Sequence, residues 1–347
     1  MPEASGAPSR FTYVGFDVDA VEATLTCRYD LDGEAFTERF GLEQPGDVSG
    51  LEAVEAARLL FLLAGVSYYK TGAPPVVDLG GHEVTAAELD LLEHLYRDGL
   101  GEFAHVNGID LAGLRIEAQV VADPDPLPAM PTAGPLVPFG GGIDSIVTVD
   151  VAMVAEDDPS LFVVSRPGDR FAAIEGPAEL TGLEVVRVWR ALDEKLLDGV
   201  DRGYRNGHVP VTAIISAAAV WAAAATGRGP VVMSNERSAS TPAIIDGREV
   251  NHQWSKSWAF EQRFASVLAK RVPSVGYFSM LRPCSELWVA ERFAKLRAFH
   301  PLFRSCNRSF TIDPERRLDH WCASCDKCAF IDLVLAPFLA APELPAI

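Results

Sequence analysis

The alternation of apolar and polar positions predicts a small α+β region over roughly the first third of the chain. Segments 10–19, 22–33 and 34–42 alternate as the strands of an antiparallel sheet do, with a turn at Asp32-Gly33. Apolar residues then recur at helical spacing near 50–64 and 86–97. We expect these elements to form an N-terminal domain over residues 1–125.

Further along the chain the pattern changes, and strands are predicted to alternate with helices. Short apolar runs occur at 134–139, 160–165, 183–188, 230–234 and 275–279. Longer stretches of helical periodicity lie near 143–156, 171–181, 210–226, 257–271 and 285–297. Such alternation predicts an α/β domain over residues 136–347, with a parallel sheet covered on both faces. Ligands of such sheets bind beyond the carboxyl ends of the strands.

A proline-rich stretch separates the two patterns. Residues 121–135, VADPDPLPAMPTAGP, contain five prolines, a density that suits an extended connection and neither a helix nor a central strand. We interpret residues 126–135 as a linker between the two predicted domains.

Composition restricts the kinds of partner. The 347 residues carry a formal charge of −18, which argues against non-specific binding to nucleic acid or to anionic membranes. The first residues lack the basic-then-apolar order of a secretion signal. The longest run of small apolar residues, at 211–227, is shorter than the ~20 residues of a spanning helix and indicates a buried helix. We therefore expect a cytoplasmic protein that binds neither nucleic acid nor membrane.

The sequence PFGGGIDSIVT joins a predicted strand to a predicted helix. Its residues Gly140, Gly141, Gly142, Asp144 and Ser145 are suited to an anion site, because backbone N–H groups at a helix start are unobstructed by side chains there. The alternative is a turn whose glycines serve backbone geometry alone. The stretch is neither a Walker loop nor a G-x-G-x-x-G motif.

This loop resembles the Ser-Gly-Gly-x-Asp-Ser loop of the PP-loop, or N-type, ATP pyrophosphatases. Gly140 stands where that family usually has serine, while Gly141, Gly142, Asp144 and Ser145 match. The resemblance implies a Rossmann-like domain of the adenine nucleotide alpha hydrolase type. It also implies that the loop holds the pyrophosphate of ATP, which is cleaved between the α and β phosphates.

A series of polar motifs narrows the resemblance. From about residue 60 onward, AGVSYYKTGAPP, NGHVPVTAIISA, VVMSNERSAS, VNHQWSKSWAFE and YFSMLRPCSELWVAERFA occur in order, followed by HPLFRSCNRSF and HWCASCDKCAF. Together they look like the UDP-N-acetylmuramoyl-L-alanyl-L-glutamate epimerases of bacterial peptidoglycan synthesis. The resemblance implies inversion of the terminal L-glutamate of a UDP-muramoyl dipeptide, dependent on ATP and Mg²⁺.

The chemistry explains why an epimerase would use such a fold. The Cα proton beside a carboxylate is very weakly acidic, because its removal builds a dianion. Conversion of the carboxylate to an acyl-adenylate removes the negative charge, so that a base can take the proton and return it from the other face. Hydrolysis then releases AMP.

Candidate residues follow the strand at 230–234. Ser234, Asn235 and Arg237 are candidates for holding the nucleotide, and Glu236 for binding magnesium or acting as a base. The alternative is a polar surface loop with an incidental Glu-Arg pair.

Other residues are candidates for proton transfer and charge neutralisation. His252 is our first candidate for proton transfer, since imidazole titrates near neutrality, although a structural histidine remains an alternative. Lys256 is a candidate for neutralising charge as pyrophosphate departs, and Cys284 is a conceivable acid or base or simply a buried thiol.

Weaker candidates lie in the flanking motifs. Asn206 and His208 are candidates either for substrate contact or for capping a loop. Arg282 and Glu286 are candidates for reaching the cleft after the last strand. In the first domain, the segment Tyr68-Tyr69-Lys70 either closes over the sugar nucleotide or forms a plain hydrophobic turn.

Four cysteines form the sharpest metal signal. Cys306 is followed by fifteen residues and then by Cys322, Cys325 and Cys328, a spacing that suits tetrahedral zinc. An iron–sulfur cluster or reduced thiols are the alternatives.

Two rival functions remain open at this level. One is another PP-loop adenylating enzyme that transfers nitrogen or sulfur. The other is a nucleotide-binding regulatory module, which needs only the glycine loop and leaves the later polar motifs without a role.

Overall fold

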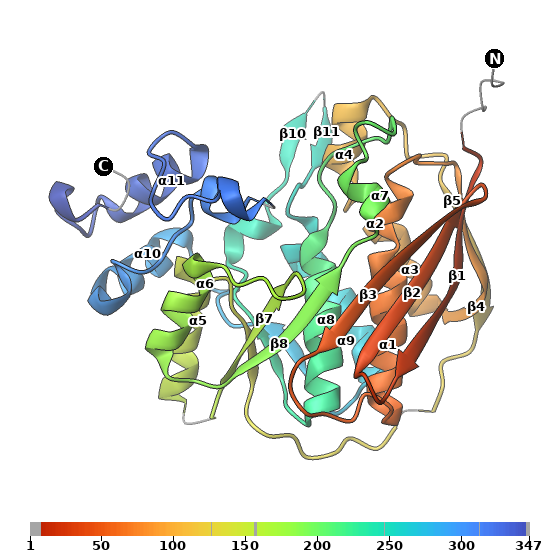
Figure 1. Cartoon of the computed structure of the whole chain (residues 1–347), viewed down its shortest axis with the longest axis horizontal. Helices are drawn as coiled ribbons and strands as arrows, with labels where there is room; N and C mark the ends of the chain where they lie inside the picture. Colours follow the sequence, from red (N-terminus) through yellow and green to blue (C-terminus); the bar gives the residue numbers. More distant parts are fainter. Residues whose placement is uncertain (1–7, 126, 156–157, 246, 312, 345–347) are drawn as a thin grey trace.

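One ten-stranded sheet forms the centre of the computed structural model, in the order β12-β9-β6-β7-β8-β3-β2-β1-β4-β5 (Figure 1). The structure describes residues 8–125, 127–155, 158–245, 247–311 and 313–344. In this part of the chain, no helix is long and apolar enough to cross a membrane.

The parallel half of the sheet confirms the predicted strand–helix alternation. It contains β6 (Leu136–Pro138), β7 (Ser160–Ser165), β8 (Val185–Ala191), β9 (Val231–Met233) and β12 (Tyr277–Ser279), all paired in parallel. From β6 the chain adds β7 and β8 on one side, then returns to add β9 and β12 on the other. The order therefore reverses between β6 and β9, where a doubly wound sheet opens a crevice for ligands.

The helices of this half also agree with the sequence pattern to within a few residues. They are α5 (Ile143–Val154), α6 (Ala172–Thr181), α8 (Val211–Thr226), α9 (Trp258–Arg271) and α10 (Glu286–Lys295). The Ala-rich α8 is buried on nearly every side and packs against α1 (Leu51–Ala64). Its small side chains allow this close approach, and a helix that is apolar all round belongs in a core.

The other half of the sheet begins with the predicted antiparallel strands β1 (Arg10–Asp19), β2 (Thr24–Leu31) and β3 (Glu34–Leu42). The predicted helix α3 (Ala86–Arg97) is present as well. Two strands were not predicted, β4 (Val76–Thr85) and β5 (Arg115–Val121), which pair in parallel beyond β1. In β4, Gly80 and Gly81 have left-handed φ angles and interrupt the register, so the alternation that would mark a strand is broken.

The two predicted regions share this sheet, because β3 pairs antiparallel with β8. Leu42 lies opposite Val188, and one continuous core contains residues from both regions. This pairing removes the free edges that two separate sheets would expose. Residue 126 of the expected linker lies outside the described residues, and residues 127–135 form no helix and only an isolated bridge, between Ala133 and Arg228.

Short elements complete the fold. They are α2 (Val66–Tyr69), α4 (Gly101–Asn107), α7 (Glu194–Leu197) and the hairpin of β10 (Ala243–Ile245) and β11 (Arg248–Val250). The C-terminal segment forms α11 (Asp326–Leu335), which packs on α10. Figure 1 shows this segment in blue next to α10, and a second apolar core holds it against the parallel half of the sheet.

Candidate active site

A cavity of about 400 Å³ lies where the strand order reverses, beyond the carboxyl ends of β6 and β9. We call it the glycine-loop cavity. It brings together predicted residues from three separate motifs: Gly140, Gly142, Asp144, Ser145, Ser234, Asn235 and Lys256. The motifs are almost 120 residues apart at their extremes, counting from Gly140 to Lys256, so the fold and not the sequence order joins them.

The backbone of the glycine loop explains why these positions are glycine. Gly141 has φ +71°, and a Cβ on it would lie 2.3 Å from the carbonyl oxygen of Ala173. A side chain is therefore excluded by both conformation and space. Gly140 differs, because a Cβ there would meet nothing within 4 Å. Gly142 begins α5 without a side-chain cap, which leaves the first-turn N–H groups for an anion.

Hydroxyl and amide groups line the cavity next to this loop. The Ser145 hydroxyl donates to the Gly142 carbonyl at 3.0 Å. Asn235 is buried, and its Nδ2 donates to Ser279 Oγ at 3.0 Å. The Ser234 hydroxyl is buried and finds no hydrogen-bond partner within the described chain. A buried polar atom without a partner costs free energy, so the Ser234 hydroxyl is available to a ligand in the cavity that it lines.

Carboxylates gather at the same edge. Burial raises the pKa of Asp144 to about 7, and the negative charge of Glu236 adds to the effect, whereas Lys256 opposes it. Glu236 is only 8% exposed. The Ser238 hydroxyl lies 2.8 Å from Glu236 Oε1 and 2.9 Å from an oxygen of Glu286, and it has one proton to share between them. This excess of negative charge fits a divalent cation.

Replacing Asp144 with asparagine is expected to stabilise the ligand-free protein at pH 8. The folded-state pKa of about 7 exceeds the usual 3.8, so the folded state keeps a proton between these values that the unfolded chain has released. The free energy of unfolding therefore falls as pH rises from ~4 to ~7, and the asparagine variant escapes this loss. The gain is on the order of a few kcal/mol at pH 8 and shrinks toward pH 4.

Urea denaturation at pH 5 and pH 8, without ATP or magnesium, measures this difference. Asp123→Asn is the matched control, because that carboxylate is exposed. An Asp144→Asn protein that is less stable than the wild type at pH 8 contradicts the expected electrostatic cost.

The sequence suggested that Arg282 reaches the cleft, but in the structure its side chain supports the loops that contain Glu236 and Lys256. Its guanidinium pairs with Glu261 at 2.7 Å. It also donates to the backbone carbonyls of Glu236, at 3.1 Å, and Lys256, at 2.7 Å. With these donors in use, Arg282 fixes the two loops that carry the predicted charged residues.

Three further candidate residues, His252, Arg237 and Cys284, do not line the glycine-loop cavity. His252 is exposed, and its ring centroid lies 6.4 Å from that of His208. Desolvation lowers the pKa of His208, and the charges of His252 and Lys256 act in the same direction. Burial raises the pKa of Cys284, so it is a thiol at neutral pH. The exposed Arg237 donates to the carbonyl of Pro283 at 2.8 Å.

Of the segment Tyr68-Tyr69-Lys70, the two tyrosines are core residues. Tyr68 stacks on Tyr29 with ring centroids 5.1 Å apart, and Tyr69 meets Tyr96 edge-on at 4.9 Å. Both rings are buried, so they do not close over a ligand. Of the two interpretations of this segment, the hydrophobic turn is therefore the one that fits the two tyrosines.

The apolar wall of the cavity was not predicted. It includes Phe162, Val164, Ile215, Met233 and Phe310. Phe310 comes from the C-terminal segment, far from the other lining residues in sequence. Nothing in the local sequence distinguishes these side chains from ordinary core residues, although their place in the cavity suits an aromatic base.

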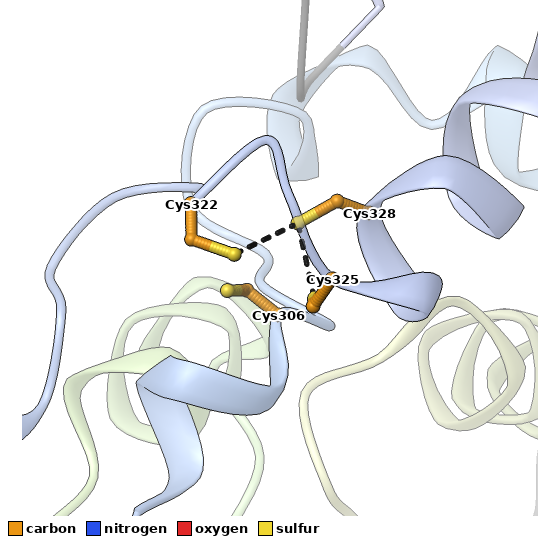
Figure 2. Close-up of side chains that lie close together, drawn as sticks. All are labelled: Cys306, Cys322, Cys325 and Cys328. Carbon is orange, nitrogen blue, oxygen red and sulfur yellow. Dashed lines mark hydrogen bonds between the residues drawn. The ribbon is translucent and has the colours of Figure 1, made fainter.

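The four cysteines of the C-terminal segment converge, as the spacing predicts (Figure 2). Their sulfurs all lie within 4.8 Å of one another. Cys328 Sγ is 3.8 Å from Cys322 Sγ and 3.4 Å from Cys325 Sγ. Tetrahedral zinc with bonds of ~2.3 Å separates its sulfurs by about 3.8 Å. Cys306 and Cys328 are buried, and all four are free of disulfides, so the set fits a thiolate-bound ion.

Comparison with known proteins identifies the family of this chain. The MurL N-terminal domain matches residues 3–280, and the MurL C-terminal domain matches residues 302–347. A UDP-N-acetyl-alpha-D-muramoyl-L-alanyl-L-glutamate epimerase of Xanthomonas oryzae pv. oryzae is 40% identical over 97% of this chain and 75% of its own length.

Epimerases of the same name from Micromonospora sp. and Salinispora tropica are 37% and 36% identical, each over 95% of this chain. The matches cover 75% and 73% of their lengths. No solved structure matches the chain. The two domain matches and these identities show that the chain belongs to the MurL family.

Proposed function

We propose that this chain inverts the terminal L-glutamate of UDP-N-acetyl-α-D-muramoyl-L-alanyl-L-glutamate to D-glutamate, in the cytoplasm, at the expense of ATP. The relatives' shared name supports the epimerisation and its substrate. The observation that carries the ATP requirement is the glycine-loop cavity, where a loop that excludes side chains meets an unpartnered Ser234 hydroxyl at the switch point of the sheet.

In this proposal the glycine loop and Ser145 hold the phosphates of ATP, and Ser234 and Asn235 hold its nucleoside or the substrate carboxylate. Asp144 and Glu236 are the ligands for Mg²⁺, which supplies charge neutralisation for the phosphates. Burial and the charge of Glu236 both raise the pKa of Asp144, so a divalent cation held by these two carboxylates would favour their ionised forms. Lys256 lines the same cavity and balances charge as pyrophosphate leaves.

The proposed reaction has three steps, which are adenylation, proton transfer and hydrolysis. The substrate carboxylate attacks the α-phosphorus of ATP, and pyrophosphate departs. A base removes the Cα proton, whose acidity the adenylate has raised, and a proton returns to the opposite face. Water then attacks the adenylate and releases AMP with the D-glutamyl product. The exposed His252, whose ring lies near that of His208, is the proposed proton carrier because an imidazole can both accept and donate a proton.

The four cysteines are proposed to hold a structural zinc ion. The ion would fix the C-terminal segment that delivers Phe310 to the glycine-loop cavity. Four protein ligands leave no open position, which is typical of structural and not catalytic zinc.

Incubation of the UDP-linked L-Ala-L-Glu substrate in D₂O with ATP and Mg²⁺ tests the proposed reaction. We expect D-glutamate carrying deuterium at Cα and one AMP released per hydrolysed adenylate, measured by NMR and chiral chromatography. Without ATP, neither exchange nor inversion is expected, because the free carboxylate leaves the Cα proton too weakly acidic.

The same assay on His252→Gln separates the steps. AMP release is expected to continue while Cα exchange slows by about 100-fold, the usual contribution of a positioned acid–base group. AMP release without any inversion by the wild type would instead indicate another acyl-adenylate acceptor. Binding of ATP without turnover would favour a regulatory module.

A further inference from the structure

A second cavity, of about 580 Å³, lies at the same edge of the sheet, beyond β7 and β8. Arg166 directly follows β7, and Arg190 is near the end of β8. The two cavities are adjacent, since Val211 lines this one and Thr212 lines the glycine-loop cavity. We call the second one the basic cavity, and two of its lining residues, Lys70 and Asn206, come from motifs that the sequence analysis considered for substrate contact.

Positively charged side chains line the basic cavity, whereas the chain as a whole is negatively charged. Lys70, Arg166, Arg190 and Arg205 line it, with Asp313 as the single carboxylate. Elsewhere acidic residues prevail, since the chain has 48 of them against 30 lysines and arginines. Arg190 is paired with the buried Glu38, so that pair contributes little net charge. Lys70 and Arg205 alone still outnumber the carboxylate of Asp313 in the lining, and a concave surface focuses their field on an anion.

Lys70 is the residue that points most clearly to an anionic ligand for the basic cavity. Its ammonium donates to Asn206 Oδ1 at 3.2 Å and to the Gly207 carbonyl at 3.3 Å, and both acceptors are neutral. Burial lowers the pKa of Lys70, and no carboxylate counteracts this. A partly desolvated ammonium without a counter-ion gains from a bound anion.

Part of the lining of the basic cavity is apolar, and we call this part the apolar wall. It is formed by Leu196, Leu197, Val200, Tyr204 and Val209. Leu197 is 51% exposed and Val200 77% exposed, although both belong to a concave surface beside the cations. Exposed apolar side chains next to a set of cations suit a ligand with a flat or apolar part and a separate anionic part.

We propose that the basic cavity binds the uridine diphosphate end of the substrate. Lys70 and Arg205 contact the diphosphate, and the apolar wall covers the uridine. This inference rests on the proposed function and deepens it. The diphosphate and the reacting glutamate lie at opposite ends of the substrate, so each needs its own site. The adjacent glycine-loop cavity then receives the glutamate together with ATP.

Calorimetric titration of UDP, used alone as the probe, tests the proposal without any turnover. Lys70→Ala and Arg205→Ala are each expected to weaken UDP binding about tenfold, since each removes a charged hydrogen bond to phosphate. ATP affinity is expected to stay within about twofold of wild type. Lys295→Ala is the matched control, because this exposed lysine pairs with Glu291 on α10, outside both cavities.

The outcomes distinguish this inference from the proposed function. Unchanged UDP affinity in both variants overturns the inference, even if the wild type epimerises the substrate. An equal loss of ATP and UDP affinity also overturns it and assigns the basic cavity to ATP. Selective loss of UDP affinity supports it even where the wild type fails to invert glutamate, since binding is measured without chemistry.

Discussion

Replacing Gly141 with alanine is expected to lower kcat/KM for ATP-dependent epimerisation by at least about 100-fold. The added Cβ would lie 2.3 Å from the Ala173 carbonyl oxygen, and the φ of +71° is unfavourable for alanine. The loop must therefore shift away from α6. A displacement of about 1 Å in a group that positions a reacting phosphate commonly costs 10²-fold in rate.

Gly140→Ser is the informative comparison. A Cβ at this neighbouring position meets nothing within 4 Å, and serine is the usual residue there in the PP-loop pyrophosphatases that the loop resembles. Its kcat/KM and its thermal stability should therefore both stay closer to wild type than those of Gly141→Ala, because only the alanine at position 141 strains the folded backbone. Equal activity of Gly141→Ala and wild type would mean that the loop does not position phosphate.

If the four cysteines hold the proposed zinc ion, replacing Cys328 with serine is expected to remove that ion and to unfold α11. Cys328 is buried among the other three thiols and lies on α11, which packs on α10. Structural zinc contributes on the order of 10 kcal/mol to the folding of small sites, more than this segment's apolar contacts are expected to replace. Metal analysis and limited proteolysis measure the two effects.

Loss of zinc should also lower the epimerase activity, because Phe310 would leave the glycine-loop cavity. The central sheet should stay folded, since its core draws on other elements. Cys284→Ser is the matched control, as this thiol lies outside the cluster and its loss should leave the zinc content unchanged. Iron with inorganic sulfide in the purified protein, or no metal at all, would contradict the zinc assignment.

Two residues of one motif illustrate what local patterns leave undecided. Tyr69 and Lys70 are neighbours in the sequence, yet Tyr69 packs on Tyr96 while Lys70 faces the basic cavity. Arg282 was expected to reach the cleft after the last strand, and in the structure it donates to the backbone carbonyls of Glu236 and Lys256. A polar side chain at a strand end can point to the ligand or to a neighbouring loop, and only the packing of both loops decides between these.

The sequence by itself determined the local elements, because periodicity, turn residues and glycines act between near neighbours in the chain. It thereby located the glycine loop at a strand end and grouped the four cysteines. The tertiary structure alone decided that β3 joins β8, that β4 continues through Gly80 and Gly81, and that Phe310 closes the glycine-loop cavity. These three features depend on contacts between segments that are distant in the sequence. The energy of such a contact comes from how two surfaces pack together, so neither segment's own sequence predicts it.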